Sequence, residues 1–337
     1  MTLPPLTPRM RTILRIAGYA AFYVVALITF AYLTFPYERL KDRIVQEFNS
    51  RQTGADALRL ELDSMSSYWL GGVEAEGIRL ISPPKPASGG TAPAKPSTLA
   101  IESAHARVGL FSLLFGGLDL SFGADAFGGE ISGFTSGDET KRKIELELDD
   151  LDLAEAPLLA TLVGLPLSGK LSGNLDLVLP ESKVSKADGT VELEIEELAV
   201  GDGKAKIRDT IALPRVEAGT LVLKGDASQG QLKLTDFSAK GPDLEIVSDG
   251  SIRLRDPVHT SFLSLGLRFR FTERYANKNE TTRALFGAKG SSMPGLFDLD
   301  PKNKRAKRED GFYAWRITGV LSNPSFTPGG PASPPGR

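Results

Sequence analysis

The chain has 337 residues, and its 40 Lys and Arg against 42 Asp and Glu give a formal charge of −2, which excludes a general nucleic-acid-binding surface. The sequence contains no cysteine, so disulfide frameworks, thiolate zinc sites and cysteine nucleophiles are excluded. With 41% hydrophobic and 24% charged residues, the composition is that of a globular protein, and the 35 glycines and 22 prolines favour a turn-rich β protein.

The N-terminal segment predicts a membrane anchor. Ile16 to Phe35, IAGYAAFYVVALITFAYLTF, is a run of 20 residues without a charge, which as a helix spans about 30 Å, the thickness of the hydrocarbon core of a bilayer. Three arginines precede the run: Arg9, Arg11 and Arg15. By the positive-inside rule, residues 1–14 are cytoplasmic and residues 15–35 form a single transmembrane helix. The sequence after this helix is then periplasmic in a bacterial inner membrane. A cleaved signal peptide is the alternative, but its apolar stretch is usually only about 7–15 residues long.

An amphipathic helix is expected over residues 36–50. Leu40, Ile44 and Phe48 recur at helical spacing, with charged residues between them. Such a helix either caps the next domain or lies on the bilayer surface.

Residues 51–326 are expected to form a β-rich domain, because the hydrophobic period changes from 3.6 to 2. The clearest run alternates Leu263, Leu265, Leu267, Phe269 and Phe271 with Ser264, Gly266, Arg268 and Arg270. Strict alternation places one face of a sheet against apolar material and the other against water. Turn signals separate several such runs, which predicts a long antiparallel meander.

Four segments interrupt the alternation. Residues 83–98 are rich in Pro, Gly, Ser and Ala and predict a flexible loop. Residues 154–164 and 272–287 have the composition of short helices, and residues 327–337 predict a disordered tail.

The sequence offers no catalytic constellation, no metal site and no cofactor motif. His105 and His259, the only histidines, lack a partner at metal-ligand spacing. Two acidic triplets, Glu145/Glu147/Asp149 and Glu192/Glu194/Glu196, are interpreted as the solvated face of a strand. The basic residues of 302–308 are expected in a polar loop, which is solvated or contacts anionic headgroups or an acidic partner.

The apolar strand faces leave two outcomes open. If a second layer covers them, the domain is a structural or docking module. If the glycine-rich sheet curls into an open trough, the apolar lining can hold acyl chains. Alternation alone does not separate these outcomes. The candidate residues for a core face or a groove are Leu263, Leu265, Leu267, Phe269 and Phe271.

Three segments resemble a known family. They are the membrane helix followed by FPYERLKDRI (35–44), the phrase LSGKLSGNLDL (167–177) and the phrase ITGVLSNP (317–324). These segments are similar to segments of the type II secretion system protein N (GspN) family and of the wider AsmA-like group. The resemblance implies an inner-membrane protein with a curved, β-rich periplasmic domain, and it carries over no catalytic residues.

The expected function is therefore a non-enzymatic scaffold or assembly role in type II secretion, with inner-membrane lipid and other secretion components as partners. The alternative is an AsmA-like lipid-binding or lipid-transfer module that holds phospholipid acyl chains in an apolar groove.

Overall fold

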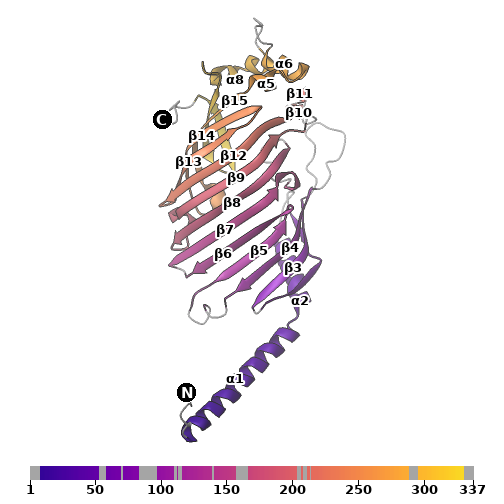
Figure 1. Cartoon of the computed structure of the whole chain (residues 1–337), viewed down its shortest axis with the longest axis vertical. Coiled ribbons are helices and arrows are strands. Elements are labelled where there is room, and N and C mark those ends of the chain that lie inside the picture. The colour runs from indigo at the N-terminus through magenta and orange to yellow at the C-terminus, as the bar shows by residue number, and fades with distance from the viewer. Residues whose placement is uncertain are drawn as a thin grey trace, which may run out of the picture.

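The computed structural model describes residues 8–52, 58–69, 71–82, 97–109, 112, 116–138, 140–156, 166–202, 206–207, 211–212, 214–287 and 295–329. Within them the protein is mainly β, with one large antiparallel sheet, a few short helices and one long N-terminal helix (Figure 1). This confirms the fold class expected from the alternation.

The N-terminal helix α1 (Pro8–Thr34) contains the segment Leu14–Thr34, which is long and apolar enough to cross a membrane. None of this span is buried against the rest of the protein. Pro36 separates α1 from α2 (Tyr37–Arg51), which confirms a second helix close to residues 36–50.

Helix α2 packs against the first edge of the sheet, so of its two expected roles it takes the capping one. Both polar groups of the Asn49 side chain pair with the backbone of Leu60, at 3.1 Å to its carbonyl oxygen and 2.8 Å from its nitrogen. The Asn49 amide thus makes the two hydrogen bonds that a neighbouring strand would make with Leu60 at this edge. The Tyr32 hydroxyl, near the end of α1, donates to Ser67 Oγ at 2.8 Å, which links the anchor to the same edge.

The large sheet contains fifteen of the strands in the described residues. Its first half comprises β1 (Arg59–Glu61), β2 (Ser64–Tyr68), β3 (Gly72–Ser82), β4 (Ser97–Val108), β5 (Leu120–Ala126), β6 (Gly129–Gly137), β7 (Lys141–Asp152) and β8 (Leu167–Pro180). Its second half comprises β9 (Asp188–Val200), β12 (Val216–Ser228), β13 (Gln231–Lys240), β14 (Leu244–Arg253), β15 (Phe262–Phe271), β16 (Tyr313–Val320) and β17 (Asn323–Pro328). A small separate hairpin joins β10 (Lys206–Ile207) to β11 (Ile211–Ala212).

From β3 onwards each strand of the large sheet pairs with the next sheet strand along the chain, while β1 and β2 share the free edge of β3. Short 3-10 turns occur at η1 (Leu153–Glu155), η2 (Val184–Lys186) and η3 (Val258–Thr260). Between β15 and β16 the chain forms α5 (Glu273–Ala276), α6 (Glu280–Phe286), α7 (Leu296–Leu299) and α8 (Pro301–Ala306). Helices α5 and α6 confirm the helical segment expected at 272–287.

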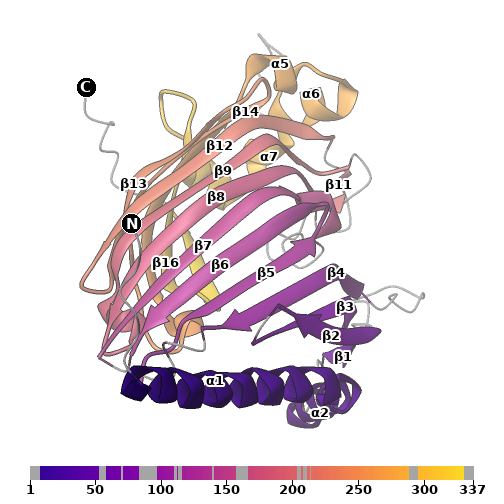
Figure 2. The same cartoon turned by 60° about the horizontal axis from the view of Figure 1, so that its bottom comes forward.

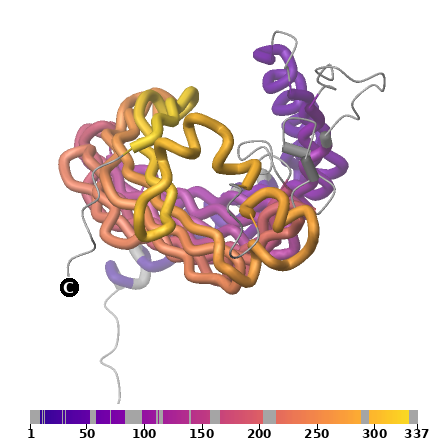
Figure 3. The backbone as a smooth tube through the Cα atoms, turned by 90° about the horizontal axis from the view of Figure 1, so that it is seen from above, coloured from indigo at the N-terminus to yellow at the C-terminus, as the bar shows by residue number. Residues whose placement is uncertain are grey.

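The sheet curls along its length. Figures 2 and 3 show the strands bending and the C-terminal strands curving back behind the earlier ones. Glycines within strands permit this bending: Gly189, at φ +143, lies so close to its partner strand that a Cβ would meet the Asp176 carbonyl oxygen at 2.0 Å. The conformation and the lack of a side chain are both required at that position.

Three sequence boundaries need correction. Ser97 and Thr98 begin β4, so the loop expected over 83–98 ends too late, and its remaining residues lie outside the described ones. The tail expected from residue 327 begins too early, because β17 continues to Pro328. The helix expected over 154–164 is described only to residue 156, where η1 forms a single 3-10 turn.

Candidate functional site

One face of the sheet is apolar from β4 to β17. In an antiparallel pair, residues opposite each other point to the same face, so the pairing register can be followed from strand to strand. One such row, one residue per strand, runs Val108, Leu120, Thr135, Ile144, Leu177, Gly189, Ala227, Leu232, Ile252, Leu263, Gly319 and Pro324. Thr135 is the only member of this row with a polar side chain.

The adjacent row belongs to the opposite face and is polar. It runs Arg107, Ser121, Phe134, Glu145, Asp176, Thr190, Asp226, Lys233, Ser251, Ser264, Thr318 and Ser325. The alternation seen in single strands therefore stays in register across the sheet. As a result, the molecule has one continuous apolar face and one continuous polar face.

The apolar face is concave. Residues from both halves of the sheet, such as Leu171 in β8 and Phe269 in β15, pack against one cluster that includes Tyr275 of α5 and Leu285 of α6. Strands from both halves of the sheet reach this one cluster because the sheet curls, as Figures 2 and 3 show. We call this concave surface the apolar trough.

The trough is covered at one end and much less in its middle. At the covered end Leu198, Val216, Ala218 and Leu244 are buried with the helices. In the middle, the aliphatic side chains are only half-buried: Ile144, Leu146, Leu175, Leu177 and Leu193. A close-packed core would remove such side chains from solvent, so this part of the face is not a sealed core among the described residues.

Six aromatic rings close the covered end. Their centroids form a chain of contacts: Phe269 to Tyr313 at 5.6 Å, Phe269 to Phe271 at 5.8 Å, Phe271 to Tyr275 at 5.4 Å, Phe271 to Phe286 at 4.5 Å, Phe286 to Phe297 at 5.5 Å and Phe297 to Tyr313 at 5.1 Å. These separations are those of favourable ring packing. We call these six residues the aromatic cap.

The two phenols of the cap have fixed hydrogen-bond partners. Tyr275 donates its hydroxyl proton to the carbonyl oxygen of Pro214 at 2.7 Å, and Tyr313 donates to Asp298 at 2.6 Å. Burial raises the pKa of Tyr275 far above its ordinary value, with a smaller contribution from the charge of Asp243. Burial raises the pKa of Tyr313 in the same direction, and its hydrogen bond to Asp298 adds to the effect. Both phenols therefore stay protonated well above physiological pH, and their hydroxyls serve as hydrogen-bond donors within the cap.

A buried carboxylate holds the cap helices to the sheet. Asp243 is fully buried in the turn between β13 and β14, where its Oδ2 lies 2.9 Å from Lys278 Nζ and accepts from the Glu217 backbone at 3.2 Å. Arg274 Nε lies 3.7 Å from the other oxygen of this carboxylate. Because a buried charge is costly unless it is paired, these contacts hold helix α5, which contains Arg274, and Lys278 just after it against the β13–β14 turn.

The five candidate residues of β15 all lie on the apolar trough, but their surroundings differ. Leu263 is buried, Leu265 and Leu267 are half-buried along the trough wall, and Phe269 and Phe271 belong to the aromatic cap. The cap residues Tyr275, Phe286, Phe297 and Tyr313 were not expected from the sequence. Aromatic side chains spaced through residues 272–313 were the only available signal.

The polar residues considered for chemistry are separated. His105 lies on the polar face, stacked on Tyr68 at 4.2 Å, whereas His259 is exposed in η3. Within the described ranges no group of three or more His, Asp or Glu has the arrangement of a metal site. The basic segment 302–308 was expected as a loop but starts with α8, whose first turn is capped by the side chain of Asp300.

No protein-family model, curated protein or solved structure matches this chain. The candidate function therefore depends on the geometry of the trough and on the sequence resemblance.

Proposed function

We propose that this protein is a non-enzymatic, membrane-tethered module that binds phospholipid acyl chains in the apolar trough. The observation that carries the proposal is the continuous apolar row across twelve strands, in which the side chains of Ile144 in β7 and Leu177 in β8 are only partly buried. Each buried methylene of an acyl chain gains about 0.8 kcal/mol, so a long apolar surface of this kind favours a long hydrocarbon ligand.

The anchor supports the same proposal. Helix α1 has the length and hydropathy of a membrane span, and the contacts of α2 and Tyr32 hold the first sheet edge next to it. An acyl chain leaving the bilayer would then meet the sheet within a short distance. The arginines in the N-terminal part of α1, Arg9, Arg11 and Arg15, favour a cytoplasmic N-terminus, with the sheet on the periplasmic side of a bacterial inner membrane.

Photo-crosslinking in cells tests lipid binding directly. A photoreactive phenylalanine at Leu193, on the trough, is expected to attach to radiolabelled phospholipid on illumination. The same residue at Glu194 is the matched control, since that position is one residue along β9 and on the polar face. Equal labelling at both positions would contradict the proposal, because lipid would then be contacting the surface without preference.

A second candidate function is favoured by the resemblance to the GspN family: an assembly component of the type II secretion system. The three similar segments fall in different parts of the fold, namely α1 with the start of α2, strand β8 and the β16–β17 edge. A family likeness spread over the anchor and both halves of the sheet is consistent with a shared architecture.

Deletion of the gene distinguishes the two candidates. Under the secretion hypothesis, substrates of type II secretion are expected to accumulate in the periplasm, and expression of the full chain restores their export. Intact secretion together with an altered outer-membrane lipid composition would reject the secretion role and favour lipid handling.

A further inference from the structure

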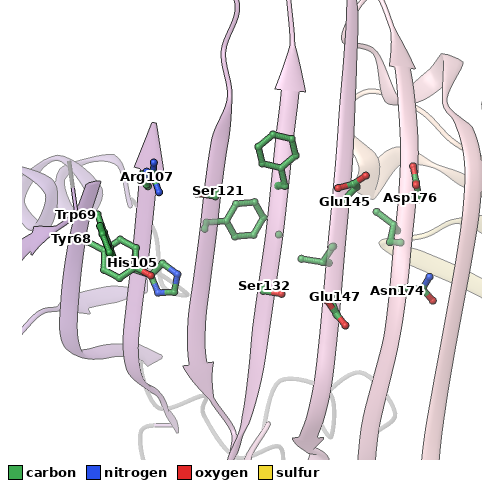
Figure 4. Close-up of a pocket in the computed structure, with 15 residues that line it drawn as sticks. Tyr68, Trp69, His105, Arg107, Ser121, Ser132, Glu145, Glu147, Asn174 and Asp176 are labelled. Carbon is green, nitrogen blue, oxygen red and sulfur yellow. The ribbon is translucent and has the colours of Figure 1, made fainter. Parts of the chain in front are cut away.

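The polar face contains a hollow of about 660 Å³, on the opposite side of the sheet from the apolar trough. It crosses the strands from the β2–β3 turn to β8, and Figure 4 shows its lining side chains in sequence across those strands. A concavity of this size falls within the range of small-molecule sites.

The hollow exists because small residues lie between larger ones. Ser121 of β5 and Ser132 of β6 line the hollow, and the ring of His105, which also lines it, leans over Gly123 of β5. A Cβ at Gly123 would lie only 2.5 Å from that ring, so the glycine is needed for its position. The neighbouring strands β4 and β7 carry long side chains at the corresponding places, and these form two walls.

The first wall is aromatic and basic. The rings of Tyr68 and His105 stack at 4.2 Å with an interplanar angle of 24°. Trp69, in the turn after β2, is 72% exposed beside them, and Arg107 follows on β4. An exposed tryptophan next to a stacked pair gives broad, rigid apolar surfaces that face solvent.

Phe134 stands opposite this wall and breaks the alternation of the sheet. It is the only residue with an apolar side chain in the twelve-residue polar row, and its neighbour Thr135 is the only residue with a polar one in the adjacent apolar row. The order of Phe134 and Thr135 is thus inverted relative to the other strands. As a result, the trough side has a threonine where an apolar side chain would be buried, and Phe134 is 37% exposed at the hollow.

The second wall supplies hydrogen-bonding groups. Glu145 and Asp176 lie opposite each other on β7 and β8 and share Lys143, which is 3.3 Å from Asp176. Glu147 and Asn174 form the next cross-strand pair. Together they present carboxylate and amide groups that accept and donate hydrogen bonds across the hollow.

We propose that this hollow is a saccharide-binding site. A pyranose ring has an apolar face of C–H groups, which packs on exposed aromatic rings, and a rim of hydroxyls, which pairs with carboxylates, amides and guanidinium groups. Here the aromatic and polar groups meet in one shallow hollow of mixed charge, which fits a ligand rich in hydroxyls better than a simple ion. The site lies on the other face from the trough, so it does not depend on lipid binding.

Tryptophan fluorescence tests the proposal, because the sequence has only two tryptophans, Trp69 and Trp315. In a Trp315→Phe variant of the full chain, Trp69 alone reports on the hollow. The protein is held in a detergent without a sugar headgroup and titrated with N-acetylglucosamine oligomers. Saturable change in the Trp69 emission is expected, with affinity weakened about tenfold by Phe134→Ser and by Glu147→Gln.

Phe262→Ser is the matched control, since Phe262 is a similarly exposed aromatic residue (41%) on the polar face, at β15 and away from the hollow. It should leave the affinity unchanged. A flat titration in a variant that keeps its β-sheet circular dichroism would overturn the proposal, and so would equal weakening by all three substitutions.

Two glycan sources share this chemistry, and sedimentation separates them. Binding to purified murein sacculi identifies a cell-wall glycan, whereas binding to vesicles containing lipopolysaccharide identifies its sugars, and either result supports the site. If instead a lysine-rich peptide changes the Trp69 emission, moderate salt abolishes the change and the sugars have no effect, the hollow is a peptide site and the saccharide proposal fails.

Discussion

Leu265→Glu should empty the apolar trough of lipid and leave the sheet folded. Leu265 lies on the trough wall between Gly250 and Ile317 and is only half-buried, so a carboxylate placed there can reach water through the open part of the trough. A bound acyl chain would have to desolvate that charge, which is unfavourable. We expect labelling by radioactive phospholipid from a photoreactive residue at Leu193 to fall roughly tenfold or more.

Two neighbouring substitutions serve as controls for this experiment. Ser264→Glu puts the same charge on the polar face, and labelling should remain at the level of the unmodified chain. Leu263→Glu buries the charge at a position that is 6% exposed, and this variant should lose its folded structure. If Leu265→Glu unfolds like Leu263→Glu, the trough is a closed core and the lipid-binding proposal is wrong.

Removal of the ring of Tyr275, in the aromatic cap, should cause a large decrease in the free energy of unfolding. The side chain is fully buried, packs on Phe271 at 5.4 Å and on Phe286 at 5.8 Å, and donates a hydrogen bond to Pro214. Tyr275→Ala should lower the free energy of unfolding by about 4 kcal/mol, because it leaves a large cavity that the cap helices cannot fill. Denaturant titration of the full chain in detergent, followed by circular dichroism, measures the change.

Tyr275→Phe separates packing from hydrogen bonding. It keeps the ring and removes only the hydroxyl that donates to the Pro214 carbonyl, at a cost of about 1–2 kcal/mol. Similar losses in both variants would mean that the hydrogen bond dominates and that the rings of the cap contribute little.

The sequence predicted the faces of the sheet well, because alternation is a local property. The run from Leu263 to Phe271 shows which side chains share a face, and the pairing register extends that face through the other strands. The identity of the concave face, by contrast, depends on the curvature of many strands and on the helices between β15 and β16. No single segment encodes either feature.

The aromatic cap and the inversion at Phe134 and Thr135 could not be predicted from the sequence for a related reason. The aromatic cap brings together residues from β15, α5, α6, α7 and β16, and their contacts follow only from the folded path of the chain. The inversion at Phe134 and Thr135 is visible in the sequence, but in one strand alone it looks like an irregularity. Its meaning emerges only when the cross-strand rows are compared.

The order of the strands has a consequence for how the protein is made. Since each sheet strand after β3 pairs with the sheet strand that precedes it, the template for every new strand is already present when that strand is synthesised. The loop-closure entropy of each addition is small compared with that of a Greek-key or parallel arrangement. The sheet can therefore assemble progressively outward from the edge next to α1 during synthesis, with β16 and β17 added last.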